Sequence, residues 1–133
     1  MVDRAGAAAW IAAYERAWRT AGTRSLADLF TEDASYRASP YEKPAIGLAA
    51  IGELWERERV GPDEAFEMSH ELVAVDGDTA VARVEVEYAT GAQYRDLWLI
   101  CFAADGRCEE FEEWPYWPGQ PLSAGEARSR GDR

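Results

Sequence analysis

Apolar side chains recur at helical spacing in the first half of the chain and at every second position in the second half. The segment from about Asp3 to Ala21 has apolar residues on one side and charged residues on the other, and Gly22 ends it. A short second helix is expected after a cap at Ser25. A third helix is expected through Leu48–Trp55, closed by Gly61-Pro62.

After these helices the period of the pattern changes to two. Four strands are expected there, at Phe66–Val75, Thr79–Ala89, Tyr94–Ala103 and Arg107–Trp117. A further short strand is expected earlier, at Ala34–Ser39, between the second and third helices. Short turns rich in Gly and Asp separate the last four strands, as in an antiparallel meander. We therefore predict one α+β domain over residues 1–117, with the sheet wrapped around the helices, and a disordered polar tail over residues 118–133.

The turns also predict which residues share the face that the helices cover. A two-residue turn before the last strand sets Trp98 opposite Glu113, and three-residue turns set Val84 opposite Trp98 and His70 opposite Val84. Asp96 falls one step along the same face. His70 and Asp96 are then roughly 10 Å apart, a span that suits a small ligand held between two polar ends.

The opposite face of the last two strands is also partly apolar. It carries Leu97, Leu99, Cys101, Trp114 and Tyr116. An outer sheet face with this character usually packs against something. We expect a homodimer formed through this face.

Composition narrows the choice of partner and compartment. The net charge of −11 disfavours nucleic acid and membrane surfaces, and no apolar run is long enough for a membrane helix. The apolar stretch near the N-terminus continues into an amphipathic pattern without a cleavage site, so we interpret it as a helix of the mature protein. Two cysteines form no disulfide framework, so we expect Cys101 and Cys108 to be free thiols on the outer face and the protein to be cytoplasmic.

Several short landmarks follow one another along the chain. They are Ala13-Tyr14, the run from Leu29 to Ala34, Ser39-Pro40, Gly47, Ile51, the run from Tyr94 to Trp98, Asp105-Gly106-Arg107, Phe111 and Trp114. Between Trp10 and Trp117 they resemble the SnoaL-like branch of the nuclear transport factor two-like superfamily. This resemblance implies a cone-shaped, cystatin-like α+β barrel, with three N-terminal helices packed in a strongly curved antiparallel sheet around one pocket.

Within this superfamily the chain is similar to ketosteroid isomerases only in part. Tyr14 falls at their oxyanion-binding tyrosine, but Ala38 or Ser39 falls at their general-base carboxylate and Trp98 at their second oxyanion donor. The partial match implies a chemistry other than steroid isomerisation. Polyketide cyclases keep an acid–base aspartate on the last strand, and Glu113 resembles it.

Four residues are therefore candidates for catalysis, each with a structural alternative. Glu113 is either an acid–base carboxylate with a raised pKa or a solvated member of an acidic run. Asp96 either orients a ligand or anchors the first helix. His70, the single histidine, either transfers protons or is a satisfied core residue. Tyr14 either donates a hydrogen bond into the pocket or is a core aromatic.

Six Trp, six Tyr and four Phe are many for this length, and they can build rigid cavity walls. The residues expected to contact a ligand are Trp18, Tyr36, Trp55, Val84, Tyr88, Trp98 and Phe111. One histidine and two cysteines that are not clustered cannot supply a usual zinc ligand set, so we expect no metal site and no cofactor. The sequence thus predicts a pocket for a small apolar molecule. It leaves open a cofactor-free isomerase, lyase or cyclase, or a module that only binds a ligand or dimerises.

Overall fold

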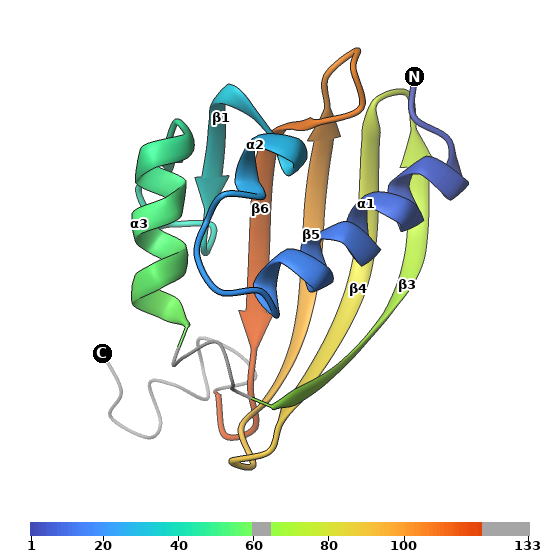
Figure 1. The fold of residues 1–133 in the computed structure, drawn as a ribbon. Coiled ribbons are helices and arrows are strands. Elements are labelled where there is room, and N and C mark those ends of the chain that lie inside the picture. The colour runs from blue at the N-terminus through green and yellow to red at the C-terminus, as the bar shows by residue number, and fades with distance from the viewer. Residues whose placement is uncertain (60–64, 121–133) are drawn as a thin grey trace.

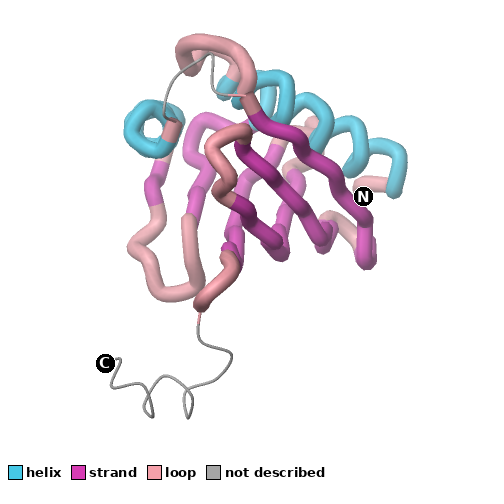
Figure 2. The backbone as a smooth tube through the Cα atoms, turned by 90° about the horizontal axis from the view of Figure 1, so that it is seen from below, coloured by secondary structure: helices cyan, strands magenta, loops and turns pink. Residues whose placement is uncertain are grey.

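The computed structural model of the protein describes residues 1–59 and 65–120. Its elements, in chain order, are α1 (Arg4–Trp18), α2 (Leu26–Leu29), β1 (Phe30–Arg37), β2 (Ala45–Ile46), α3 (Leu48–Glu58), β3 (Phe66–Asp76), β4 (Thr79–Tyr88), β5 (Gln93–Phe102) and β6 (Cys108–Tyr116). Figure 1 shows α1 crossing the sheet and α3 standing beside β1. In Figure 2 the curved sheet has both of these helices on one side. The predicted α+β fold with helices on the concave face is confirmed.

The six strands form one sheet in the order β2-β1-β6-β5-β4-β3. Four of its five neighbouring strand pairs are antiparallel, as predicted, but β1 and β6 pair in parallel, so the prediction of a purely antiparallel sheet is wrong at this pair. The chain leaves β1 through β2 and α3 and joins the sheet again at its far edge with β3. The antiparallel meander from β3 to β6 then returns beside β1 in the same direction.

Helix α1 begins at Arg4 because the side chain of Asp3 accepts a hydrogen bond from the backbone N–H of Gly6 at 2.7 Å. The residues of its buried face are Ala7, Trp10, Ile11, Tyr14 and Ala17. This spacing is the one that predicted the helix. The helix ends at Trp18 rather than at the predicted Ala21.

The side chain of Arg59 hydrogen-bonds to the backbone carbonyl groups that follow the end of α1. Its guanidinium donates to the backbone oxygens of Thr20 at 2.6 Å and Gly22 at 2.8 Å, and it pairs with Glu56. Although charged, Arg59 is only 9% exposed. Free carbonyls at a helix end need such partners when they are shielded from water. Arg59 therefore fixes the C-terminal end of α1 against α3.

The strand registers decide which residues share the concave face. Trp98 pairs with Glu113 and His70 with Val84, as predicted. Val84, however, pairs with Asp96, so the predicted pairing of Val84 with Trp98 is wrong by two residues. The loop between β4 and β5 starts one residue earlier than the sequence indicated. Because this shift is even, every side chain keeps its face.

Aromatic rings fill the space between α1 and the sheet. The ring centroid of Tyr14 lies 4.5 Å from that of Trp98 and 4.9 Å from that of Trp55. Trp98 and Phe111 are buried beneath the helices, as predicted, and their rings meet edge to face at 5.1 Å. Such contacts add to the free energy gained by burying the rings. The result is a rigid aromatic layer that extends toward one end of the sheet.

The two cysteines are free, but they differ in position. Cys101 is partly exposed on the outer face, as expected, whereas Cys108 is fully buried. The prediction that both thiols face outward is therefore wrong for Cys108. A bulge between Cys101 and Phe102 sets Cys108 opposite Phe102 and turns its side chain inward.

Some predictions fall outside the described residues. They are the closing of the third helix by Gly61-Pro62 and, beyond Gln120, the disordered tail. Within the described ranges, no helix is long and apolar enough to span a membrane.

Candidate functional site

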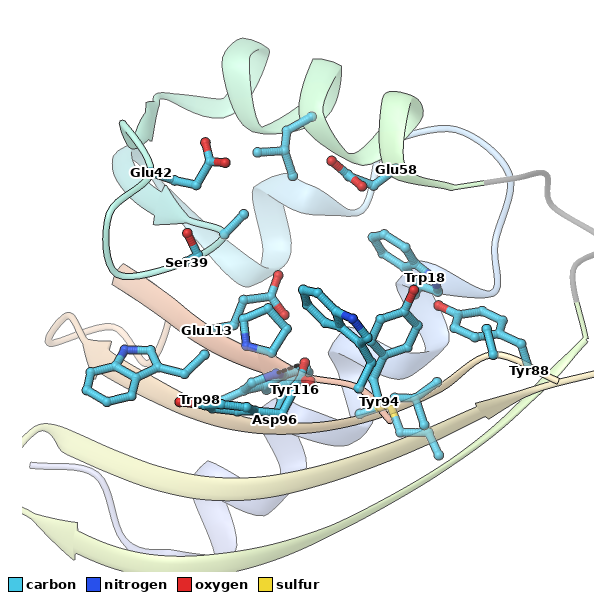
Figure 3. A pocket seen from close by; sticks show the side chains of 18 of the residues that line it. Trp18, Ser39, Glu42, Glu58, Tyr88, Tyr94, Asp96, Trp98, Glu113 and Tyr116 are labelled. Atoms are coloured by element: carbon cyan, nitrogen blue, oxygen red, sulfur yellow. Dashed lines mark hydrogen bonds between the residues drawn. The ribbon is translucent and has the colours of Figure 1, made fainter. Parts of the chain in front are cut away.

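A cavity of about 840 Å³ lies at one end of the sheet, between the C-terminal ends of α1 and α3 and the loop after β1. Figure 3 shows side chains from these elements and from β4, β5 and β6 converging on it. Aromatic residues of its wall are Tyr14, Trp18, Tyr36, Tyr41, Phe66, Tyr88, Tyr94, Trp98, Trp114, Tyr116 and Trp117. Large apolar walls with a few convergent polar groups are typical of small-molecule sites.

Two tyrosines from different elements meet in this cavity. The hydroxyl oxygens of Tyr14 on α1 and Tyr36 on β1 are 2.6 Å apart. Both side chains are buried, at 6% and 1% exposure. Burial raises the pKa of each phenol well above 10.0, and the nearby Glu113 raises it further. Both hydroxyls therefore keep their protons and act as hydrogen-bond donors.

Two carboxyl groups lie beside the tyrosines. Glu113 on β6 and Asp96 on β5 both face the cavity, and their side chains hydrogen-bond to each other. Burial is the largest cause that raises the pKa of Glu113 well above 4.5, and the charge of Asp96 adds to it. Burial also raises the pKa of Asp96. Two adjacent buried carboxylates cannot both be charged at low cost, so the pair holds one proton between them.

These four groups form a continuous hydrogen-bonded chain. The Tyr36 hydroxyl donates to Oε1 of Glu113 at 3.4 Å, and the indole Nε1 of Trp98 donates to Oδ2 of Asp96 at the same distance. Such an arrangement places a carboxyl group that holds its proton more readily than an ordinary glutamate next to neutral donors. It can stabilise an oxyanion while a proton moves.

The structure brings most of the predicted site residues together. Those that line the cavity are Tyr14, Trp18, Tyr36, Tyr88, Asp96, Trp98 and Glu113. Trp55, Val84 and Phe111 do not: each is fully buried in the core behind the wall. Trp55 and Phe111 instead support the ring of Tyr14 from two sides.

His70 is the predicted catalytic residue that the structure places elsewhere. Its pairing with Val84 is as predicted, but its side chain is exposed and does not line the cavity. β3 is the edge strand of the sheet, so among the described residues β4 is the one strand that pairs beside this position. The α1 helix reaches β3 further along, where Arg4 donates to the carbonyl of Leu72 at 3.0 Å.

Sequence reasoning missed two acidic residues of the cavity. Glu58, in the last turn of α3, and Glu42, in the loop after β1, both line it. Their positions depend on how α3 and this loop pack, for which local sequence carries no signal. Among the described residues, no cluster of three or more His, Cys, Asp or Glu side chains is arranged to hold a metal ion.

The sequence pattern that defines the SnoaL-like domain matches residues 10–111. The chain belongs to the SnoaL-like domain family. The predicted resemblance is thus confirmed. No curated protein matches the sequence of this SnoaL-like chain.

Solved structures of the same fold include enzymes. The epoxide hydrolase/cyclase-like enzyme SalBIII, which acts in pyran ring formation in salinomycin, is 16% identical with a TM-score of 0.71, covering 90% of this chain and 95% of that one. A steroid delta-isomerase from Pseudomonas aeruginosa is 20% identical, with a TM-score of 0.58 over 97% and 88% of the two chains. An NTF2-like protein from Mesorhizobium loti is 22% identical, with a TM-score of 0.65 over 87% and 96%. At these identities the likeness is one of fold.

Proposed function

We propose that this SnoaL-like protein is an enzyme without a cofactor that transfers a proton on a small, largely apolar carbonyl or polyketide-like compound. The observation that carries the proposal is the chain from Tyr14 through Tyr36 and Glu113 to Asp96 inside an aromatic cavity. Isomerases, lyases and cyclases of this kind need a base, an acid and a donor for the oxyanion.

Each group has a role that follows from its environment. Glu113 takes a proton from a carbon next to the carbonyl and returns it, because its raised pKa brings its two protonation states closer in energy near neutral pH. Asp96 shares the proton of the resting state. Tyr14 and Tyr36 remain neutral and donate to the developing oxyanion.

The structural relatives support this class of reaction, though at the level of fold. One is described as cyclase-like and another as a steroid isomerase. Steroid isomerisation itself is disfavoured here, because Ala38 or Ser39 stands where ketosteroid isomerases keep their base. Glu113 therefore has to act from the opposite wall of the cavity. We also propose a reducing cytoplasm as its compartment, since Cys101 and Cys108 are both free.

The alternative is a module that binds a ligand without reacting. It is favoured by the deep burial of Tyr14 and Tyr36, whose hydroxyls already satisfy each other. In that case the cavity uses the two carboxyl groups only to orient a ligand.

Exchange of carbon-bound hydrogen distinguishes the two. A panel of cyclic ketones, 1,3-diketones and polyketide fragments is incubated with the protein in D₂O, and loss of the α-proton signals is followed by NMR. We expect catalysed exchange for at least one compound, and a loss of about 10²–10⁴-fold in Glu113→Gln, the usual contribution of a general base. Glu110→Gln, an exposed position on the same strand, is the control and should keep the wild-type rate.

Ligands that raise the thermal midpoint without any exchange would contradict catalysis and support the binding module. Exchange that persists in Glu113→Gln would show that another group is the base.

A further inference from the structure

Acidic side chains line the cavity without any basic partner. Glu42, Glu58, Asp96 and Glu113 contribute to its wall, and among the described residues no Arg, Lys or His does. Figure 3 shows Glu42 and Glu58 on the helix-and-loop side of the cavity, with Glu113 and Asp96 on the strands below. A ligand bound here is therefore surrounded by negative charge.

The arginines near the cavity are engaged elsewhere. Arg37 bonds to the backbone carbonyl of Glu42 and contacts the carboxylate of Glu112 at 3.5 Å. Arg59 caps α1 and pairs with Glu56. Neither arginine neutralises Glu58, for which the described part of the chain contains no ion pair.

The charge of Glu58 reaches across the cavity, because it is one of the causes that raise the pKa of Glu113. The carboxylate of Glu58 and the Asp96–Glu113 pair thus act on the same part of the cavity. Any positive group placed between them would interact favourably with both.

Asp96 adds a second, independent observation. Its side chain is 7% exposed, and it lines the cavity. Its Oδ2 accepts from Trp98, but no N–H or hydroxyl group of the described residues donates to Oδ1. The proton that Asp96 shares with Glu113 is therefore the remaining partner for this buried oxygen, and an N–H group on a ligand would give it a further donor.

The aromatic wall is suited to the same kind of ligand. The faces of Trp and Tyr rings attract cations, most strongly where water is excluded. Trp18 and Tyr14 stack at 6.3 Å in the wall, and Figure 3 shows Glu58 above Trp18. Carboxylates combined with aromatic rings are the usual environment of ammonium groups, whereas a carboxylate or phosphate ligand would be repelled.

We propose that the ligand of this cavity is a cation, an apolar compound with a protonated or quaternary amine held between Glu58 and the Asp96–Glu113 pair. This inference rests on the proposed function and narrows its substrate class to amine-bearing carbonyl compounds. Anionic substrates are excluded by the same charges.

Three probes with a common benzyl group test it: benzyltrimethylammonium, its uncharged carbon isostere neopentylbenzene, and phenylacetate. Their dissociation constants are measured by NMR titration of the full chain. We expect the cation to bind at least 10-fold more tightly than the isostere, and phenylacetate not to bind. Raising the salt concentration should weaken the binding of the cation and leave the binding of the uncharged isostere unchanged, because salt screens interactions between charges.

Glu58→Gln should weaken binding of the cation 5-fold or more and leave the isostere unchanged. Glu53→Gln, an exposed position on the same helix outside the cavity wall, is the matched control and should leave both unchanged. Equal affinity for cation and isostere, no binding of the cation at millimolar concentration, or an equal effect of Glu58→Gln on both probes would overturn the inference. These readings involve binding only. If the cation shows no preferred binding while Glu113→Gln still abolishes α-proton exchange, the proposed function holds and only the preference for a cationic ligand is refuted.

Discussion

The hydroxyl oxygen of Tyr14 lies 2.6 Å from that of Tyr36, and the Tyr36 hydroxyl donates in turn to Glu113. A hydroxyl has one proton to give, so while Tyr36 donates to Glu113 it accepts from Tyr14. A protonated Glu113 can donate to Tyr36 instead. The order of protons along the chain then reverses, and Tyr14 can donate to a ligand.

Replacing the middle member should show how strongly the chain is coupled. Tyr36→Phe removes the donor that lowers the pKa of Glu113, so that pKa should rise further. It also leaves the buried Tyr14 hydroxyl without its partner, at a cost of about 1–3 kcal/mol in the free energy of unfolding. Carboxyl titration by NMR and denaturant unfolding measure the two effects. Tyr41→Phe, at a fully exposed tyrosine of the cavity rim, is the control, and an effect of equal size there would refute the coupling.

The raised pKa of Glu113 makes stability depend on pH. An acid whose pKa is higher in the folded state binds more protons when folded, so the wild type loses stability as the pH rises above the ordinary value of 4.5. Glutamine does not titrate. As the pH rises, the unfolding free energy of Glu113→Gln should therefore increase relative to that of the wild type, by up to about 1.4 kcal/mol for each unit by which the pKa is raised.

Urea unfolding between pH 5 and pH 8 measures this difference. Glu110→Gln should run parallel to the wild type, because its side chain is exposed. Parallel curves for Glu113→Gln would mean that Glu113 titrates as a surface glutamate.

Arg59 should contribute strongly to stability. Arg59→Met keeps much of the side-chain volume but leaves the carbonyls of Thr20 and Gly22 without their donor. Because the partner Glu56 is itself exposed, we expect a loss of about 1.5–3 kcal/mol, the range for hydrogen bonds to a charged group. Arg57→Met, on the exposed side of the same helix, should change the unfolding free energy by less than about 0.5 kcal/mol. A small effect at Arg59 would show that water replaces it.

The outer sheet face is the surface through which we predict a homodimer. Leu97 is 36% exposed on this face, whereas Trp114 and Tyr116, which the sequence also places there, line the cavity. Leu97→Glu should give monomers in analytical ultracentrifugation, because it places a charge in an apolar contact. Ile46→Glu, on the exposed edge strand β2, should leave the association unchanged. A wild-type protein that sediments as a monomer at high micromolar concentration would exclude the dimer.

Much of the fold follows from the sequence, because the spacing of apolar residues and the lengths of the turns constrain the strands independently. The face of Trp98 and its pairing with Glu113 could be predicted, since each turn fixes a register and a slip of one residue exposes apolar side chains. The pairing of Val84 with Asp96 was missed, because the sequence does not determine where a three-residue loop begins. A register shift of two residues leaves each side chain on the same face of the sheet. The error therefore does not change which strand residues are predicted to face the cavity.

Other parts of the site depend on which residues are covered by other elements of the fold, and the spacing of apolar residues carries no information about this. His70 has an inward-facing register, yet it is exposed because its strand lies at the edge. Trp55 and Val84 were predicted as wall residues, but both are fully buried in the core and do not line the cavity. Arg59 follows the end of α3, and nothing in its local sequence marks it as a buried residue. Its role depends on carbonyls that approach it from a distant part of the chain.

The parallel pairing of β1 with β6 has a consequence for the order in which the protein assembles. Tyr36 and Glu113 are 77 residues apart, and within the described ranges the only other strand beside β1 is the two-residue β2. During synthesis, β1 therefore has almost no ladder to join until the last strand has left the ribosome. Contacts between such distant segments form slowly. The proton chain cannot exist in a partly made molecule, because its two halves are first brought together by the strand that completes the sheet.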